Sequence, residues 1–456
     1  MGRFRLHPLL AASLALAVLG PSSLPPLAAA PAALRHAPAA VSPVVVAATP
    51  DRFLAWPANN GFWSWQGGRE MLVGFSDGPW RPELEGHKVG QPQEFRLARS
   101  LDGGLTWNVE IPPQDVSRIG TPLPPGPGEI RFDHPDLAVR VVAGAGRRGA
   151  ERLGAFHVST DRGRTWRGPW AFSGLEDDPR LAGLRITSRT SVLPQGRDSA
   201  VFLLSAQDPS LGRVSGRLDK TFAVRSDDGG RQFRFLGWLV PWGDPHRAVM
   251  PSAVDLGGGR FVAALRRRNP RGGESENWID LVVSNDGGRR WSFRSRVGES
   301  GCCNGNPPAL TRLRDGRLAC AWADRKRQLM LLRLSSDEGR TWGPERVVRA
   351  NPHASDMGYP QIGQNDRGEL VILYYLATAE RPASFIEASL IEASLLEASR
   401  VRAERHRARP VIVTRGVGQG GPSAAGNNPP LSQRPTGATT AAHGPGATAR
   451  EWRWES

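Results

Sequence analysis

Arginines in two separate segments are the residues with the clearest chemical potential in this sequence. Three are consecutive, Arg266, Arg267 and Arg268, and two more, Arg325 and Arg327, follow a later apolar run. The planar guanidinium group holds a carboxylate through two parallel hydrogen bonds, so arginines that converge from separate segments would bind an acidic substrate. Side chains alternate along a strand, which places Arg266 and Arg268 on one side and Arg267 on the other. Spacing alone leaves open which side points inward.

The chain that must position these arginines is built from repeats. The pattern Ser-x-Asp-x-Gly-x-Thr-Trp occurs five times, twice in looser form, at residues 100–107, 159–166, 226–233, 284–291 and 335–342. In each copy the Asp carboxylate can accept backbone N–H bonds across a turn, the Gly allows a positive φ, and the Trp covers the turn. Each copy therefore predicts a turn between two antiparallel strands.

A second series of glycine-rich turns runs in register with the first. Its members are Gly68, Gly126, Gly196, Gly258, Gly316 and Gly368. Each precedes a strand-like run, so every unit of about 57 residues is predicted to hold two hairpins and four strands. Six units predict an all-β fold, a six-bladed β-propeller with four-stranded antiparallel blades, over residues 51–395. A stack of separate sandwiches is the alternative.

The two ends of the chain differ from the repeats. Residues 1–30 carry Arg3 and Arg5, an apolar run at 8–20 and small residues at 27–30, which is typical of a signal peptide and predicts a secreted or periplasmic protein. No later segment is long and apolar enough to predict membrane insertion after its removal. Residues 31–50 include a run at 44–48 that could supply the missing outer strand of the last unit. Residues 396–456 are of low complexity and predicted to be disordered.

The composition limits the kinds of ligand and partner that the sequence predicts. The net charge is +15, yet nearly all of the 59 basic residues are arginines, and no block of five or more like charges occurs. Nucleic acid is therefore not predicted as a partner. The three cysteines, Cys302, Cys303 and Cys320, allow at most one ordinary bridge, to Cys320, with one thiol left over. No spacing typical of a metal site occurs, and no metal or cofactor is predicted.

The face that carries function follows from the blade geometry. Both kinds of repeated turn fall on one face and are short and uniform, which is typical of structural turns. The longer, irregular connections fall on the opposite face, where function is expected. That face is predicted to hold the arginines above, together with Asp77 and Tyr359.

The five Asp turns, known as Asp boxes, resemble those of the sialidase (neuraminidase) superfamily, in particular secreted bacterial BNR-repeat proteins. The resemblance spans residues 52–390. It implies a glycoside hydrolase of exo-α-sialidase type that cleaves terminal sialic acid or a related acidic sugar from glycans. Such sites use an arginine triad for the carboxylate, a tyrosine nucleophile activated by a glutamate, and an aspartate as acid/base. Asp boxes also occur in propellers that hydrolyse nothing.

Residue by residue, the resemblance places the nucleophile at Tyr359 and the acid/base at Asp77. Arg327 matches the third arginine, with Arg325 as its alternative, and the second arginine lies in the triple run. The predicted catalytic residues are Tyr359 and Asp77, and the predicted substrate-binding residues are Arg266, Arg267, Arg325, Arg327 and Asn59.

Two departures from the family pattern weigh against catalysis. The first arginine is missing, and Asn59 or Asn60 stands in its vicinity. Met250 stands where the family has its glutamate, unless Glu274 or Glu276 swings in from the next loop. The alternative prediction is a non-catalytic propeller that binds acidic glycans.

Overall fold

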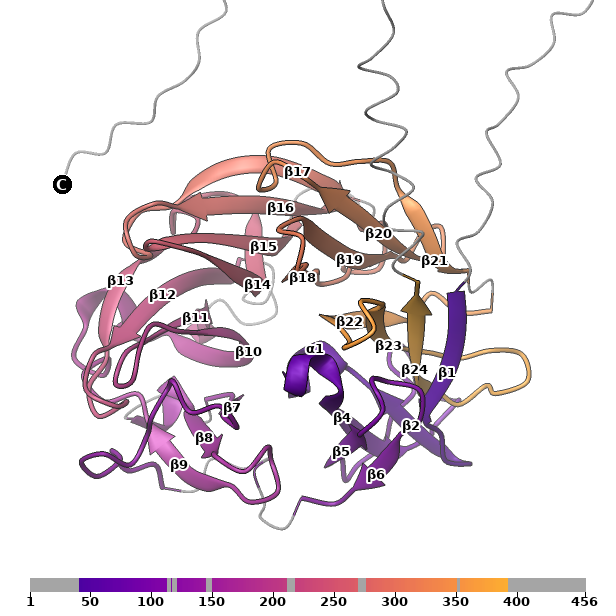
Figure 1. Cartoon of the computed structure of the whole chain (residues 1–456), viewed down its shortest axis with the longest axis horizontal. Coiled ribbons are helices and arrows are strands. Elements are labelled where there is room, and N and C mark those ends of the chain that lie inside the picture. Colours follow the sequence, from indigo (N-terminus) through magenta and orange to yellow (C-terminus); the bar gives the residue numbers. More distant parts are fainter. Residues whose placement is uncertain are drawn as a thin grey trace, which may run out of the picture. The chain divides into compact units, whose positions relative to one another are not determined.

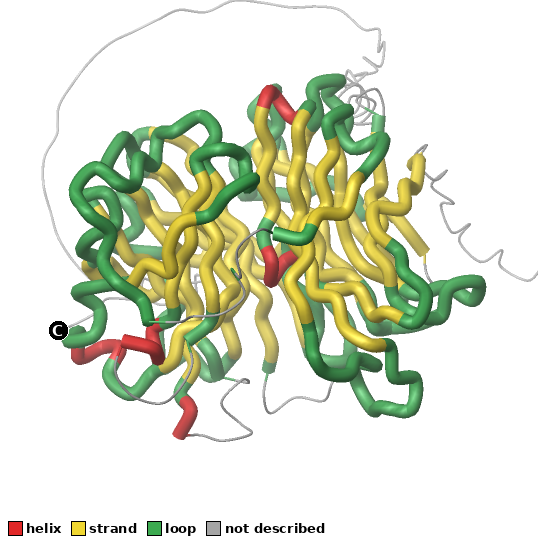
Figure 2. Tube along the Cα trace, turned by 90° about the horizontal axis from the view of Figure 1, so that it is seen from below, coloured by secondary structure: helices red, strands yellow, loops and turns green. Residues whose placement is uncertain are grey.

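The computed structural model describes residues 41–112, 116, 121–144, 150–210, 218–269, 276–350 and 353–392. All of these residues belong to one compact unit. The predicted signal peptide, 1–30, and low-complexity tail, 396–456, lie outside the described residues. Within the described part, strands dominate and follow one another around a common axis (Figure 1). The loops gather at the two ends of the strands (Figure 2).

The last sheet joins the two ends of the described chain. Its order is β1-β24-β23-β22, made of β1 (Val41–Ala47), β22 (Gly358–Gln364), β23 (Leu370–Leu376) and β24 (Phe385–Ile391). Val41 lies opposite Ile391 in the antiparallel β1–β24 pair. The N-terminal segment thus supplies the outer strand of this sheet, over 41–47 where the sequence suggested 44–48.

The largest sheet contains eight strands. They are β10 (Arg185–Pro194), β11 (Ala200–Gln207), β12 (Lys220–Ser226), β13 (Arg234–Trp238), β14 (Arg247–Gly257), β15 (Arg260–Arg268), β16 (Asn277–Ser284) and β17 (Ser292–Glu299). A single parallel bridge, Lys220 to Ala248, links β12 to β14. All other pairs are antiparallel, so the bridge divides this sheet into two groups of four strands.

Two further sheets contain four and five strands, so the second has one strand more than predicted. One is β18 (Ala309–Arg312), β19 (Leu318–Asp324), β20 (Leu329–Ser335) and β21 (Arg346–Ala350). The other has five strands, β2 (Arg52–Ala55), β3 (Phe62–Trp65), β4 (Glu70–Pro79), β5 (Glu94–Ser100) and β6 (Asn108–Glu110). The short helix α1 (Pro57–Asn60) joins β2 to β3, and the 3-10 helix η1 (Gln66–Gly68) joins β3 to β4.

The remaining sheet has one strand fewer than the predicted four. It contains only β7 (Ala138–Val142), β8 (Ala155–Ser159) and β9 (Arg167–Ala171), with η2 (Ala150–Leu153) before β8 and η3 (Pro179–Leu181) after β9. The strand predicted after Gly126 does not form, and residues 124–136 run as turns. The backbone N–H groups of Phe132 and His134 donate instead to the carbonyls of Arg197 and Arg131, at 2.7 and 3.2 Å, so this stretch forms its hydrogen bonds outside a sheet ladder.

The Asp boxes form the turns predicted for them. In the first, the Asp102 carboxylate accepts hydrogen bonds from the backbone N–H groups of Leu105 and Thr106, at 3.1 and 2.9 Å. Trp107 covers the turn and donates from its ring nitrogen to the Gly104 carbonyl at 3.0 Å. The box joins β5 to β6, which pair antiparallel. The four other boxes likewise join β8 to β9, β12 to β13, β16 to β17 and β20 to β21.

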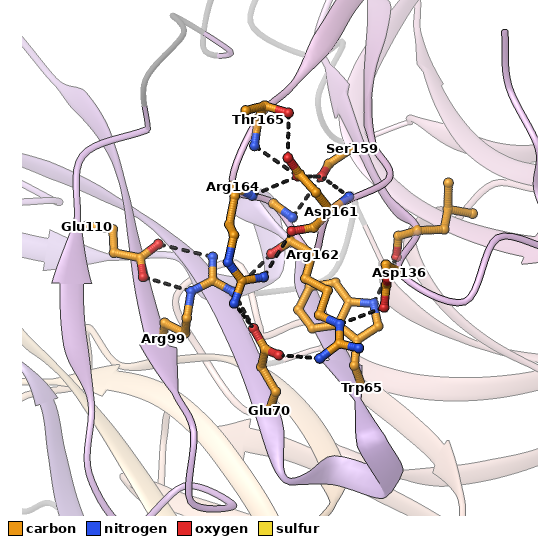
Figure 3. A network of polar contacts seen from close by, with 12 residues as sticks. Trp65, Glu70, Arg99, Glu110, Asp136, Ser159, Asp161, Arg162, Arg164 and Thr165 are labelled. Carbon is orange, nitrogen blue, oxygen red and sulfur yellow. Dashed lines mark hydrogen bonds and ion pairs between the residues drawn. The ribbon is translucent and has the colours of Figure 1, made fainter.

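A buried carboxylate links the sheet of β2 to β6 to the Asp box of the sheet of β7 to β9 (Figure 3). Glu70, at the start of β4, is 3% exposed and accepts hydrogen bonds from Arg99, Arg162 and Arg164. Arg162 and Arg164 belong to the box between β8 and β9, and Arg99 belongs to β5. Three cations around one carboxylate tie the two sheets together.

Apolar side chains fill the space between neighbouring sheets. Phe156 of β8 and Phe202 of β11 are fully buried, with ring centroids 5.7 Å apart. Phe172 and Phe233 complete this cluster. Such tilted aromatic contacts hold the layers in register. None of the helices in the described part of the chain is long and apolar enough to cross a membrane.

Candidate functional site

Tyr359 lies at the start of β22, in a backbone conformation that the local sequence supports. Its φ is +50° and that of Gly358 is +103°. A Cβ on Gly358 would lie 2.5 Å from the Asn306 amide, so only glycine fits there. The Asn306 side chain in turn accepts a hydrogen bond from the Tyr359 backbone N–H at 2.9 Å and donates to the Met357 carbonyl at 2.8 Å. The tyrosine is thereby fixed and 5% exposed.

Strained backbone gathers around this tyrosine. Residues other than glycine rarely adopt a positive φ, and such outliers cluster at functional sites. Trp56, Met250, Cys303, Asn304 and Tyr359 all have φ between 50° and 71°. Three of them lie in two connections, Trp56 before α1 and Cys303 and Asn304 between β17 and β18, whereas Met250 lies in β14 and Tyr359 in β22.

Arg266 comes from β15 and points to the tyrosine. Its side chain is fully buried, and its Nη1 donates to the Tyr359 hydroxyl at 3.1 Å. The same nitrogen lies 3.5 Å from the sulfur of Met250, so Met250 is a direct neighbour of Arg266. The remaining donors meet the carbonyls of Asn304 and Gly305. Arg266 is thus both a cation beside the phenol and a support for the loop at 302–305.

Arg267 points the other way, as strand alternation predicts. Its guanidinium meets Asp244 at 3.0 Å and Asp280 at 3.3 Å, and lies 5.9 Å from the ring centroid of Trp278. Arg268 returns to the side of Arg266 and donates to the Asn304 side chain at 2.8 Å. The structure therefore does not bring Arg267 to Tyr359.

Arg325, rather than Arg327, lies beside the tyrosine. Arg325 is 5% exposed, its Cζ lies 5.6 Å from the Tyr359 ring centroid, and its Nη2 donates to the Tyr375 hydroxyl at 2.9 Å. Burial lowers the pKa of Arg325, but the nearby Tyr375, Tyr359 and Asp356 outweigh it, and the pKa is raised. Arg327 instead forms ion pairs with Asp324 at 2.6 Å and Glu345 at 2.9 Å, with 44% of its side chain exposed.

A carboxylate and a histidine that sequence reasoning did not assign complete the cluster. Asp356 accepts hydrogen bonds from the Tyr375 hydroxyl and from Arg325, and lies 3.0 Å from Nδ1 of His87. Burial raises the pKa of Asp356, but His87, Arg325 and Tyr375 outweigh it, and the pKa is lowered. The only available signal was that both residues lie in long connections on the face expected to be functional.

Asp77 and Asn59 occupy other surroundings. Asp77, on β4, pairs with Arg52 at 2.6 Å and with Arg96 at 3.5 Å. Asn59, on α1, lines a cavity of about 280 Å³, and its side-chain oxygen is buried without a hydrogen-bond partner in the described part of the chain. Arg140 of β7 lines the same cavity and donates to the Asn60 carbonyl at 2.9 Å. The guanidinium of Arg140 therefore lies beside Asn59 and Asn60, the position where this sequence lacks the first arginine of the family pattern.

The cysteine pairing differs from the prediction. Cys302 and Cys303 form a disulfide with each other, and Cys320 is a buried free thiol. The prediction assumed that adjacent cysteines do not pair, whereas here the chain turns at Cys303, whose φ is +60°. The Cys303 carbonyl accepts from Arg325 at 3.2 Å. The loop at 302–305 thus supplies backbone acceptors to both Arg266 and Arg325.

The cluster can perform electrostatic and proton-transfer chemistry. Two guanidinium groups stabilise negative charge at the phenol or on a bound anion, and the His–Asp pair can hold a proton. In the part of the chain that the structure describes, no group of three or more His, Cys, Asp or Glu residues is arranged to hold a metal ion.

Comparisons with known proteins give a family and a fold. Residues 137–372 match the BNR repeat-like domain family. A protein of unknown function from Dyadobacter fermentans has a similar structure, with a TM-score of 0.58 and 20% identity, over 77% of this chain and 99% of that one. An α-L-arabinanase from Penicillium chrysogenum gives a TM-score of 0.49 at 14% identity, over 77% and 99% of the two chains. The Hadza microbial sialidase Hz136 gives 0.48 at 16%, over 75% and 66%. No curated protein matches.

Proposed function

The chain belongs to the BNR repeat-like domain family, and from this premise we propose that it is a secreted or periplasmic glycoside hydrolase of exo-α-sialidase type. The proposed substrate is a glycan that ends in sialic acid or a related acidic sugar. The resemblance of the Asp boxes implies this activity and substrate. The contacts around Tyr359 support both.

One observation carries the proposal, the proximity of two guanidinium groups to the Tyr359 phenol. Arg266 donates to its hydroxyl at 3.1 Å, and the Cζ atoms of Arg266 and Arg325 lie 5.7 and 5.6 Å from its ring centroid. A phenol oxygen fixed in this way can face the anomeric carbon of a bound sugar. The same two positive charges favour a sugar carboxylate beside it.

The residues proposed to act differ in part from those expected. Tyr359 keeps the role of nucleophile, and Arg266 and Arg325 keep that of cations for the acidic substrate. Arg267 and Arg327 are left out, because each is paired with two carboxylates elsewhere. Asp77 is left out as acid/base, because its carboxylate is paired with Arg52 and Arg96.

A second function has an observation in its favour. Met250 lies next to Arg266, where a glutamate would take the phenol proton, and a thioether cannot take a proton. A propeller that binds acidic glycans without cleaving them fits this substitution. Hydrolysis and binding are separated by the experiment that follows.

The test is release of 4-methylumbelliferone from its α-sialic acid conjugate by the full-length secreted protein. Tyr359→Phe is expected to abolish release, because only the phenol oxygen is removed. Tyr374→Phe is the matched control, because Tyr374 is also buried and its hydroxyl bonds Glu387 and Ser389 instead. Release that survives in Tyr359→Phe overturns the role of Tyr359. No release from pH 4 to 8, with measurable binding of sialylated glycans, favours the binding function.

We also propose that the strand groups form six blades. Support comes from the eight-stranded sheet, which divides at one parallel bridge into two antiparallel groups of four. With the four other sheets this gives six groups. An experimental structure with a different number of radial sheets would contradict the count.

A further inference from the structure

His87 is joined through Asp356 to Arg325 and Tyr375, which surround the proposed catalytic tyrosine, and no sequence motif marks its position. It lies in the connection between β4 and β5, and 43% of its side chain is exposed. Its Nδ1 lies 3.0 and 3.1 Å from the two carboxylate oxygens of Asp356. The edge of its ring meets Trp56, with centroids 5.1 Å apart and planes at 82°. Two contacts therefore fix the ring, and no hydrogen bond to Nε2 occurs within the described part of the chain.

Asp356 is well suited to orient this histidine. Its carboxylate is itself held by the Tyr375 hydroxyl and by Nη2 of Arg325 at 3.2 Å. A histidine whose Nδ1 is held by an anchored carboxylate presents Nε2 as its working nitrogen, and the carboxylate stabilises the imidazolium. Tyr375 lies 6.1 Å from Tyr359 between ring centroids, so the His–Asp pair is coupled to the proposed nucleophile through packed side chains.

The charges that face His87 favour the protonated ring. They come from Asp356, from the Tyr359 hydroxyl and from Arg325, and the Trp56 ring on the remaining side is uncharged. Burial lowers the pKa of His87, but the hydrogen bond and charge of Asp356, assisted by Tyr359, outweigh it. Arg325 opposes them, and the net pKa is raised. An imidazolium is the form that can donate a proton.

We propose that His87 is the proton donor to the leaving-group oxygen, with Asp356 as its positioning residue, and this inference rests on the hydrolysis proposed above. In the first step the bond between the anomeric carbon and the glycosidic oxygen breaks. The electron pair stays on that oxygen, which takes the proton from Nε2 of His87. The Tyr359 oxygen bonds to the anomeric carbon, where positive charge develops, and its proton passes to Nε2 of His87. Water then displaces the tyrosine oxygen from that carbon, and one proton of the water restores the phenol.

Two substrates with different leaving groups test this role. A sugar alcohol leaves poorly without a proton, whereas methylumbelliferone leaves readily without one. In His87→Gln we expect kcat/KM for 3′-sialyllactose to fall by about 100-fold or more, and for the methylumbelliferyl conjugate by less than about 10-fold. His134→Gln is the matched control, because His134 is a half-buried loop histidine that bonds only its own turn. An equal loss on both substrates would overturn the role of His87 while leaving the hydrolase intact.

The pH profile separates proton donation from mere support of the fold. The wild-type kcat/KM is expected to fall as the pH rises through the pKa of His87, and this limb should vanish in His87→Gln. Asp356→Asn removes the charge that raises the pKa, so the limb should move to lower pH. The pKa of the His87 ring, followed by NMR, should fall in the same variant. An unchanged pKa in Asp356→Asn overturns the pairing, and a wild type that cleaves neither substrate overturns the hydrolase and the donor together.

Discussion

Replacing Glu70 by Gln tests the contact that joins the first sheet to the next Asp box. The change keeps the size of the side chain and removes its charge. Glu70 accepts hydrogen bonds from Arg99 at 2.8 Å, from Arg162 at 2.7 Å and from Arg164 at 3.1 Å. The side chains of Arg99 and Arg162 are 6% and 23% exposed, whereas that of Arg164 is 52% exposed.

The size of the loss follows from these exposures. Hydrogen bonds to charged groups contribute about 1.5–3 kcal/mol each when shielded, and exposed pairs about 0–1 kcal/mol. Arg99 and Arg162 keep Glu110 and Asp136 as partners, at 2.7 and 2.6 Å, so neither is left as a bare buried charge. We therefore expect Glu70→Gln to lower the free energy of unfolding by about 3 kcal/mol, below the upper range for a broken buried pair.

The pH dependence gives a second signature. Burial raises the pKa of Glu70, but the hydrogen bond from Arg162 and the charges of Arg164 and Arg99 outweigh it, and the pKa is lowered. A carboxylate whose pKa is lower in the folded than in the unfolded protein stabilises the fold at every pH above its unfolded-state pKa. That stabilisation is lost as the pH falls through the pKa of the folded state. The difference between wild type and Glu70→Gln should therefore be largest near neutral pH and shrink below about pH 4.

The assay is urea unfolding followed by both tryptophan fluorescence and circular dichroism, since coincident curves are needed for a free energy. Glu110→Gln is the matched control, because Glu110 pairs with Arg99 alone among these cations and is 30% exposed. We expect it to cost about 1 kcal/mol. If Glu70→Gln costs no more than Glu110→Gln, or the gap persists unchanged into acid, the reasoning about the buried carboxylate is refuted.

Two further predictions concern groups away from the site. Burial of Lys220 lowers its pKa to about 8, although Asp244 opposes this, so the unfolded chain holds that proton to higher pH than the folded one. Urea midpoints should rise between about pH 8 and 10 relative to Lys220→Met, and parallel profiles would contradict this. Cys320 is fully buried, burial raises its pKa, and the other two cysteines are bonded to each other. Mass spectrometry after alkylation should find no modified thiol in native protein, one per chain in urea, and three in urea with reductant. More than one in urea alone would disprove the Cys302–Cys303 bond.

The repeats made the fold readable, because each Asp box contains the bonds of its own turn. Asp102 meets backbone groups three and four residues away, so the local sequence determines the geometry. The family match confirms the resemblance drawn from those boxes. The strand predicted after Gly126 does not form, because the backbone N–H groups of Phe132 and His134 bond to the carbonyls of Arg197 and Arg131 and not to a neighbouring strand. A repeated turn motif predicts the position of the turn, but it does not determine whether the residues that flank it form strands.

Only part of the candidate site could be predicted from the sequence. Alternation along a strand correctly separated Arg266 from Arg267, since both lie within β15. Alternation could not separate Arg325 from Arg327, because both follow the end of β19 and lie in a turn. His87 and Asp356 are 269 residues apart and meet only through the packing of two irregular connections. No periodicity or spacing encodes such a contact, so it required the structure.

The pairing of β1 with β24 has a consequence for how the chain is made. Val41 meets Ile391, so the first described strand finds its partner only when nearly all of the described chain has been synthesised. Until then, the edge that β1 will cover does not yet exist, and β1 itself has nothing to pair with. Contacts between such distant segments make folding slow and leave strand edges open to aggregation meanwhile. A nascent chain that halts before residue 385 should therefore depend on chaperones far more than the finished protein does.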